Sequence, residues 1–273
     1  MLFVGVAVLL LAAVFFFKFA IEKGWISPTL RLLAGAAVAV VMIGLGEWSL
    51  IKRQLRLFAA GVMGGGVVLL YFVTFVASPN GWYHLIGAAP AFGLMCIVTA
   101  LGMVLSVQTR MLSTALVALI GAMATPMLLS TGENRQVLLM CYMLVVDAGF
   151  LSLGLGMRWP ALSPLALAGT AGLFGGWYAQ HFAPGAWPRT LGFAWALLGE
   201  FVAYLAVGIR TRRLGLQGAK VMLLAVVAVF TVLLLVLHPA MSGPAFLACV
   251  GAMAALGLAA CAPQKWEATC ILV

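Results

Sequence analysis

The sequence predicts an all-α fold, a polytopic transmembrane helix bundle of about ten helices, from its composition and its long apolar runs. Hydrophobic residues make up 65% of the 273 residues and charged residues only 8%, against roughly 45–50% and about 25% in soluble domains. A chain this apolar cannot cover a surface that faces water. Unbroken apolar runs exclude the alternating pattern of a membrane β-barrel, and helices are the other structure that satisfies its own backbone groups in lipid.

Ten segments are long enough to cross the bilayer, because about 20 apolar residues span its hydrocarbon core. The first five are Leu2–Ala20, Thr29–Gly46, Phe58–Ala77, Ile86–Val107 and Met111–Ser130. The second five are Val137–Leu155, Ala161–Gln180, Leu191–Ile209, Val221–Leu237 and Gly243–Cys261. The connections are short and contain turn residues. We therefore expect a single transmembrane domain over residues 1–261, followed by a short tail over 262–273.

Lys and Arg residues are unequally shared between the two sides of such a bundle. The side formed by the tail and by the connections after even-numbered spans holds Lys52, Arg53, Arg56, Arg110, Arg158, Arg210, Arg212, Arg213, Lys220 and Lys265. The opposite side holds Lys18, Lys23, Arg31, Arg135 and Arg189. Because positively charged connections stay in the cytoplasm, we expect the first of these sides, and with it both termini, to be cytoplasmic.

Charge and cysteine content indicate no partner other than membrane lipids, and they do not identify protein partners. The net charge of +9 is spread in small groups between apolar runs, so nucleic-acid binding is not expected. The five cysteines lack the C-x-x-C spacing of metal or redox sites, and we expect neither a metal nor a cofactor. The chain has no H-E-x-x-H, G-x-S-x-G or P-loop motif, so an embedded enzyme acting on lipid or glycan is the weakest functional hypothesis.

Charged and aromatic residues at span ends are expected to anchor the bundle at the lipid headgroups. Lys18 and Glu22 are four residues apart at the outer end of the first span, and Trp25 follows them. A lysine there can extend its ammonium group to the interface, where tryptophan rings also accumulate. Glu47 similarly ends the second span beside Trp48. These positions predict interface anchoring.

The three histidines fall on the predicted outer side, near its tryptophans. They are His84, His181 and His238, each beside a different span. We interpret them as part of an interfacial belt of aromatic rings with polar edges. A metal or ligand site built from all three is the alternative, although their positions show no ligand spacing.

Small residues form stripes that predict close packing between helices, since small side chains let helix backbones approach each other in lipid. The stripes are Gly61 and Gly65 with Gly64 and Gly66, Gly172 and Gly176, and Gly251 with Ala255 and Ala259.

Two acidic residues fall at the centre of a predicted span, Asp147 in the sixth and Glu200 in the eighth. A charge at that depth costs about 2.5–3.5 kcal/mol on insertion scales, so such residues face the bundle interior and are candidates for function. No Lys or Arg lies at matching depth, and a carboxyl group without a cation is expected to be neutral there. Thr170 and Thr231 lie at similar depth as possible hydrogen-bond acceptors.

Two functional hypotheses remain open for these acids. In the first, the protein is a transport or channel-like protein for a small solute or ion, and Asp147 and Glu200 line its polar pathway. In the second, the protein is a non-catalytic structural or envelope-associated membrane protein, and the buried acids only clamp helices together.

The order of residues in the first third of the chain is similar to that of a known family. A block from Val14 to Pro28 is followed by Arg31, Gly35 and Gly46-Glu47-Trp48, and the run Gly64–Gly66 and a block from Gly121 to Gly132 come later. Over most of residues 4–215, the chain resembles the bacterial membrane-protein family catalogued as domain of unknown function 2339.

This resemblance implies a multi-pass protein of the bacterial inner membrane without an established activity, and it supplies no catalytic or binding residues. Members of the family are usually longer, so the resemblance implies that the chain is a fragment of a longer member. The tail over 262–273 does not follow the family pattern, and an aberrant end is one interpretation of it.

Overall fold

The computed structural model describes residues 27–53, 55–130 and 132–261, and these residues form nine α-helices and no strand. The helices are α2 (Pro28–Arg53), α3 (Arg56–Ala77), α4 (Ala88–Thr109), α5 (Leu112–Leu128), α6 (Gln136–Met157), α7 (Leu162–His181), α8 (Trp187–Arg210), α9 (Leu216–Leu237) and α10 (Gly243–Cys261). Two 3-10 turns, η1 (Pro184–Ala186) and η2 (His238–Ala240), precede α8 and follow α9.

The predicted all-α fold is confirmed, and the nine helices correspond to the second to tenth predicted spans. The first span, the anchors Lys18, Glu22 and Trp25, and the tail lie outside the described residues. The prediction that the second span ends at Gly46 is wrong for the helix, because α2 continues to Arg53. A charged residue such as Glu47 ends the apolar segment, but headgroups and water can solvate it while the backbone stays helical.

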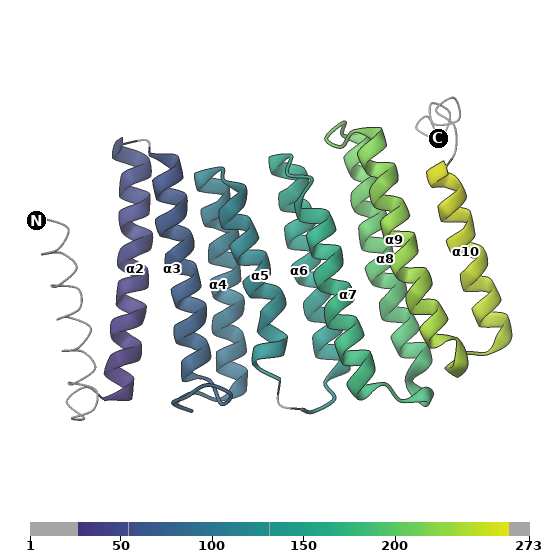
Figure 1. Ribbon diagram of the computed structural model, residues 1–273, viewed down its shortest axis with the longest axis horizontal. Coiled ribbons are helices and arrows are strands. Elements are labelled where there is room, and N and C mark those ends of the chain that lie inside the picture. The colour runs from purple at the N-terminus through teal and green to yellow at the C-terminus, as the bar shows by residue number, and fades with distance from the viewer. Residues whose placement is uncertain (1–26, 54, 131, 262–273) are drawn as a thin grey trace, which may run out of the picture.

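The helices stand side by side in one elongated row (Figure 1). Most helices pack against their neighbours in sequence, and α3, α5, α7 and α9 touch in turn to form one layer while α4, α6 and α8 form the other. Alternation of direction puts the turns α2–α3, α4–α5, α6–α7 and α8–α9 at the same end, the upper one in Figure 1. We call this the Arg-rich end and the other the His end.

Large apolar side chains cover the outside of this row. Leu57, Val145 and Leu247 are each at least 70% exposed, which a water-facing surface does not tolerate over so large an area. Six of the described helices (α2, α3, α4, α6, α8 and α9) are long and apolar enough to cross a membrane by length and composition. Lipid is therefore the natural solvent of this surface.

Buried apolar side chains form two clusters along the row. One is built around Tyr71 of α3 and Met95 of α4, and the larger one around Phe150 of α6 and Phe201 of α8. Phe92 of α4 packs against both clusters. The two clusters meet where α4 and α5 adjoin α6 and α7, and we call this boundary the seam.

The hairpin of α2 and α3 is held by close approach at glycines. A Cβ atom at Gly66 would lie 2.9 Å from the Ala39 carbonyl oxygen, and one at Gly46 would lie 3.1 Å from the Ala59 carbonyl oxygen. Helices gain little from hydrophobic burial when lipid surrounds them, so van der Waals contact at such positions stabilises the pair. The packing role predicted for this glycine stripe is confirmed at Gly66 and wrong at Gly61 and Gly64, where a Cβ atom would meet nothing within 4 Å.

Three turns at the Arg-rich end share one backbone feature. Arg110, Arg158 and Arg212 adopt the left-handed conformation, with φ of 54°, 58° and 53°. A left-handed residue is a common way to end an α-helix, usually with glycine or asparagine. Arginine here places a cation beside the helix C-terminus, where the helix dipole favours positive charge.

Replacing Gly66 with alanine is expected to lower the free energy of unfolding by about 1–3 kcal/mol, because the added methyl group must displace α2 or α3. Denaturant unfolding of the full chain in detergent measures this. The matched control is Gly61→Ala on the same helix, where a Cβ atom meets nothing within 4 Å. Equal stability of the two variants would contradict close packing at Gly66.

Candidate functional site

Most hydroxyl groups inside the spans are satisfied by their own helix. Thr74, Thr99, Thr109, Thr125 and Thr231 each donate to the carbonyl oxygen four residues earlier, at 2.7–2.9 Å. This local bond is the usual arrangement for threonine in a helix that cannot reach water. Polar side chains that bond to another helix, or to nothing, are therefore the informative ones.

Polar side chains connect α6 and α8 at both ends of these helices. At the His end, Gln136 Nε2 donates to Thr190 Oγ1 at 2.8 Å, and both residues are buried. At the Arg-rich end, Arg213 Nη1 donates to the carbonyl oxygens of Leu155 and Gly156 at 3.0 and 2.9 Å. These contacts tie α6 and α8 together as parallel neighbours.

Asp147 and Glu200 lie between those two ends at matching depth. Asp147 is about 16 Å from Gln136 along α6, and Glu200 is about 15 Å from Thr190 along α8, at 1.5 Å per residue. Helices α6 and α8 pack against each other, so the two acids lie on adjoining parallel helices. The structure thus places the two acids that the sequence singled out on neighbouring helices, each near the middle of its helix.

The hydrogen bonds of these two carboxyl groups are incomplete. Asp147 is fully buried, and its Oδ2 accepts a hydrogen bond from Thr170 Oγ1 of α7 at 2.5 Å. Its Oδ1 and both carboxyl oxygens of the half-buried Glu200 have no hydrogen-bond partner among the described residues. Three of four carboxyl oxygens at mid-depth are therefore available to a proton, a cation or a water molecule.

The two threonines predicted to lie near the acids have different hydrogen-bond partners. Thr170 contacts Asp147, as a donor in this arrangement rather than as the predicted acceptor. The hydroxyl of Thr231 instead donates to the Val227 carbonyl oxygen of its own helix, at 2.7 Å. Helix α9 touches α7 and α8, and depth alone does not specify which face of α9 Thr231 occupies.

Sequence reasoning missed three polar residues on these helices, Gln136, Thr190 and Tyr204. The Tyr204 hydroxyl is buried without a partner among the described residues. It follows Glu200 by four positions, which places both on one face of α8. That spacing was a usable signal, whereas the Gln136–Thr190 contact depends on how α6 and α8 pair.

A cavity of about 490 Å³ lies at the His end of the seam, between α4, α5, α6 and α7. Tyr142 lines it from α6, whereas Asp147, five residues later, points about 140° away around that helix. Neither acid lines the cavity. The cavity and the acid pair are therefore separate features that share α6 and α7.

The glycine stripe predicted to pack α7 against another helix lines this cavity instead. Gly172 and Gly176 both face it, and a Cβ atom at either position would meet nothing within 4 Å. The packing prediction is wrong here. The missing side chains leave open volume at the seam rather than a close contact between two backbones.

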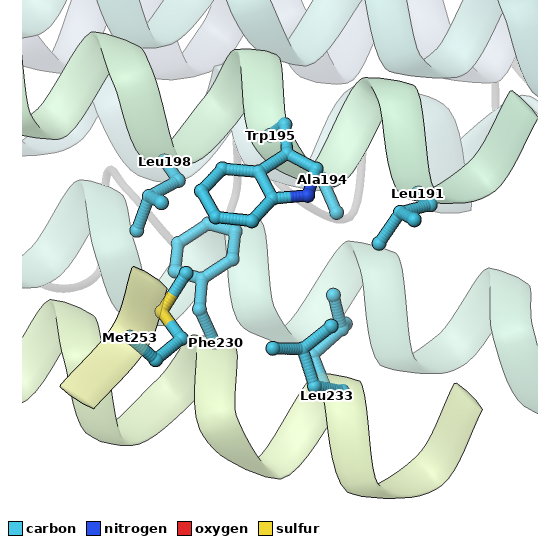
Figure 2. A pocket seen from close by; sticks show the side chains of 8 residues that line it. Leu191, Ala194, Trp195, Leu198, Phe230, Leu233 and Met253 are labelled. Atoms are coloured by element: carbon cyan, nitrogen blue, oxygen red, sulfur yellow. The ribbon is translucent and has the colours of Figure 1, made fainter. Parts of the chain in front are cut away.

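A second, much smaller crevice lies between α8, α9 and α10 (Figure 2). Trp195 and Leu198 of α8 line it together with Phe230 of α9 and Met253 of α10, and its volume is about 10 Å³. That is room for about one water molecule, and the lining side chains offer it apolar surface. We assign this crevice to helix packing.

The remaining residues chosen from sequence lie at the helix ends. Glu47 is exposed on α2, nearly two turns before that helix ends at Arg53, and its interface anchoring remains a prediction. His84, His181 and His238 lie at the His end. Within the described ranges, no group of three or more His, Cys, Asp or Glu side chains is placed to hold a metal ion.

Apolar helices, lipid-facing side chains and charged turns define a multi-pass membrane protein. The chain belongs to the family described as Predicted membrane protein (DUF2339), which matches residues 1–272. The resemblance seen in the sequence is thereby confirmed, and the match extends beyond residue 215 through α9, α10 and nearly all of the tail. No match was found among curated proteins or among solved structures.

Replacing Thr170 with valine is expected to lower the free energy of unfolding by about 1 kcal/mol, because Asp147 loses its hydrogen bond from α7. Denaturant unfolding in detergent measures the loss. The matched control is Thr231→Val, which removes only a bond within one helix. A control variant that loses as much stability as Thr170→Val would contradict the role of this interhelical contact.

Proposed function

We propose that this chain is a transport or channel-like protein for a small ion, and that Asp147 and Glu200 bind a proton or cation at the middle of the membrane. The observation that carries the proposal is that two carboxyl groups lie at matching depth on adjoining helices, and three of their four oxygens lack a hydrogen-bond partner among the described residues. Acidic groups at this depth are costly, and proteins keep them where ions or protons bind.

The chemistry of such a pair favours one bound cation or proton. Two carboxylates close together repel each other, and a shared positive charge removes that repulsion. The hydrogen bond from Thr170 holds Oδ2 of Asp147, which leaves Oδ1 for the ion. The Tyr204 hydroxyl, one turn from Glu200, is a further group that can donate or accept.

A structural role is the alternative, and the Asp147–Thr170 contact favours it. That bond joins α6 to α7, and Asp147 is fully buried, as expected for a clamp between helices. Under this alternative the acids stabilise the bundle and no ion passes them. Both functions place the protein in a lipid bilayer. We further propose that this bilayer is the bacterial inner membrane.

Variants of the acid pair separate the two functions. The full chain is reconstituted into liposomes, and fluxes of protons, Na⁺ and K⁺ are measured with an imposed gradient and ion-sensitive dyes. Asp147→Asn and Glu200→Gln keep size and hydrogen-bonding capacity but remove the charge. We expect either variant to lower the flux to the level of protein-free liposomes.

The controls are Thr231→Val in the flux assay and detergent unfolding of every variant. Transport predicts that Thr231→Val retains flux and that the acid variants keep wild-type stability. Wild-type liposomes that pass none of the three ions, or acid variants that keep full flux, would contradict the proposal. A loss of stability without any flux in the wild type supports the clamp.

We also propose that the Arg-rich end is cytoplasmic, because it carries the larger share of Lys and Arg. Alkaline phosphatase is active only outside the cytoplasm, so a fusion after Arg213 should be inactive in bacterial cells. A fusion after Gly185, at the His end, should be active. The reverse pattern would contradict the proposed orientation without affecting the helical fold.

A further inference from the structure

The cavity at the His end of the seam is a feature that the ion proposal does not use. Its volume of about 490 Å³ falls within the range of small-molecule sites, roughly 300–1,000 Å³. It lies where the two apolar clusters meet, and four helices contribute to it. It is therefore a site between two packing units, which is a common position for ligand binding.

Polarity changes along the depth of this cavity. Its charged and polar groups at this end are Ser130, Glu133 and Arg135 in the connection between α5 and α6, and Gln180 and His181 at the end of α7. From His181 the lining extends to Gly172, about 14 Å deeper along α7 at 1.5 Å per residue. A ligand that fits has a polar group at the helix ends and an apolar part that reaches toward mid-depth.

The inner walls of the cavity are apolar and come from facing helices. Phe92 of α4 and Leu139 of α6 line it together with Leu173 of α7. Phe92 and Tyr142 cross the seam with ring centroids 5.1 Å apart, and the Tyr142 hydroxyl donates to the Ala122 carbonyl oxygen. Since that hydroxyl is already bonded, these walls chiefly offer apolar surface to an occupant.

Deeper along the seam, beyond the lining of the cavity, methionine side chains of α4 and α5 pack against glycines of α6 and α7. A Cβ atom at Gly169 would lie 2.7 Å from Met123 Cγ, and one at Gly149 would lie 2.9 Å from Met103 Cε. These contacts close the seam near mid-depth, about one turn beyond Gly172. An apolar chain can therefore enter from the His end without continuing to the Arg-rich end.

Two opposite charges stand together at the mouth. Arg135 Nη2 lies 2.7 Å from Glu133 Oε2, and both side chains are more than half exposed. A headgroup with one charge would compete for one member of this pair and leave the other unmatched. A headgroup with both charges matches both, because phosphate suits the arginine fork and ammonium suits the carboxylate.

We propose that this cavity binds one lipid-like amphiphile with a zwitterionic headgroup. Its phosphate pairs with Arg135 and its ammonium with Glu133, and its apolar chain lies between Phe92, Leu139 and Leu173. The side chains absent at Gly172 and Gly176 supply the space for that chain. The proposal is independent of ion binding at Asp147 and Glu200, since neither acid lines the cavity.

Native mass spectrometry of the full chain released from detergent tests the proposal. Dioleoyl phosphatidylethanolamine and dioleoyl phosphatidylglycerol are offered at equal concentration, because only the first carries an ammonium group. We expect one phosphatidylethanolamine to be retained in preference to phosphatidylglycerol. Soluble glycerophosphoethanolamine, which has the same headgroup without chains, should fail to displace it.

Gly176→Leu fills the cavity, and Gly175→Leu is its matched control. Neither added Cβ atom meets anything within 4 Å, and Gly175 does not line the cavity. Gly176→Leu should lose the retained lipid, whereas Gly175→Leu should keep it. Both variants should elute from size exclusion like the wild type, and both should keep any ion flux.

The headgroup assignment is tested by Glu133→Gln and Arg135→Gln. Removing the carboxylate should abolish the preference for phosphatidylethanolamine, and removing the guanidinium should weaken its retention roughly tenfold. Equal retention of both lipids by the wild type, or of phosphatidylethanolamine by Gly176→Leu, would overturn the proposal. Displacement by the chain-free headgroup would overturn the role of the apolar walls.

Discussion

The exclusion of water from the spans is the constraint on which the rest of this structure depends. Without water, each backbone and side-chain polar group must find a partner within the protein. Threonines such as Thr99 and Thr125 meet this requirement within their own helix. The carboxyl oxygens of Asp147 and Glu200 differ from these threonines, because three of the four have no hydrogen-bond partner among the described residues. These incomplete hydrogen bonds, together with the acidity of the two groups, make them the candidate ion site.

The same constraint explains the elongated double row. Lipid solvates apolar side chains as well as a protein core does, so burial does not drive the helices into a compact globule. Contacts then form between neighbours in sequence and between helices two apart. Close approach at Gly66 stabilises one end of the row. The row consequently contains two apolar clusters, with a boundary between them that can remain partly open.

Helices α6 and α7 take part in both candidate sites through different faces. Asp147 and Thr170 join the two helices at mid-depth. Tyr142 and Gly176 face the cavity on the side toward α4 and α5. Contacts of Met103 and Met123 with glycines separate the cavity from the Arg-rich end. A change in the packing of α6 and α7 would therefore affect both sites.

The sequence by itself determined the helical membrane fold, the end at which most positive residues gather, and the mid-depth of Asp147 and Glu200. Each of these follows from counting residues along one helix. The rise per residue and the apolar length needed to cross the bilayer depend on that helix alone and not on its neighbours. Tertiary structure decided which faces meet. It paired Thr170 rather than Thr231 with Asp147, and it left Gly172 and Gly176 facing a cavity. Such outcomes depend on the rotation and neighbours of each helix, and in lipid an apolar stripe alone specifies neither.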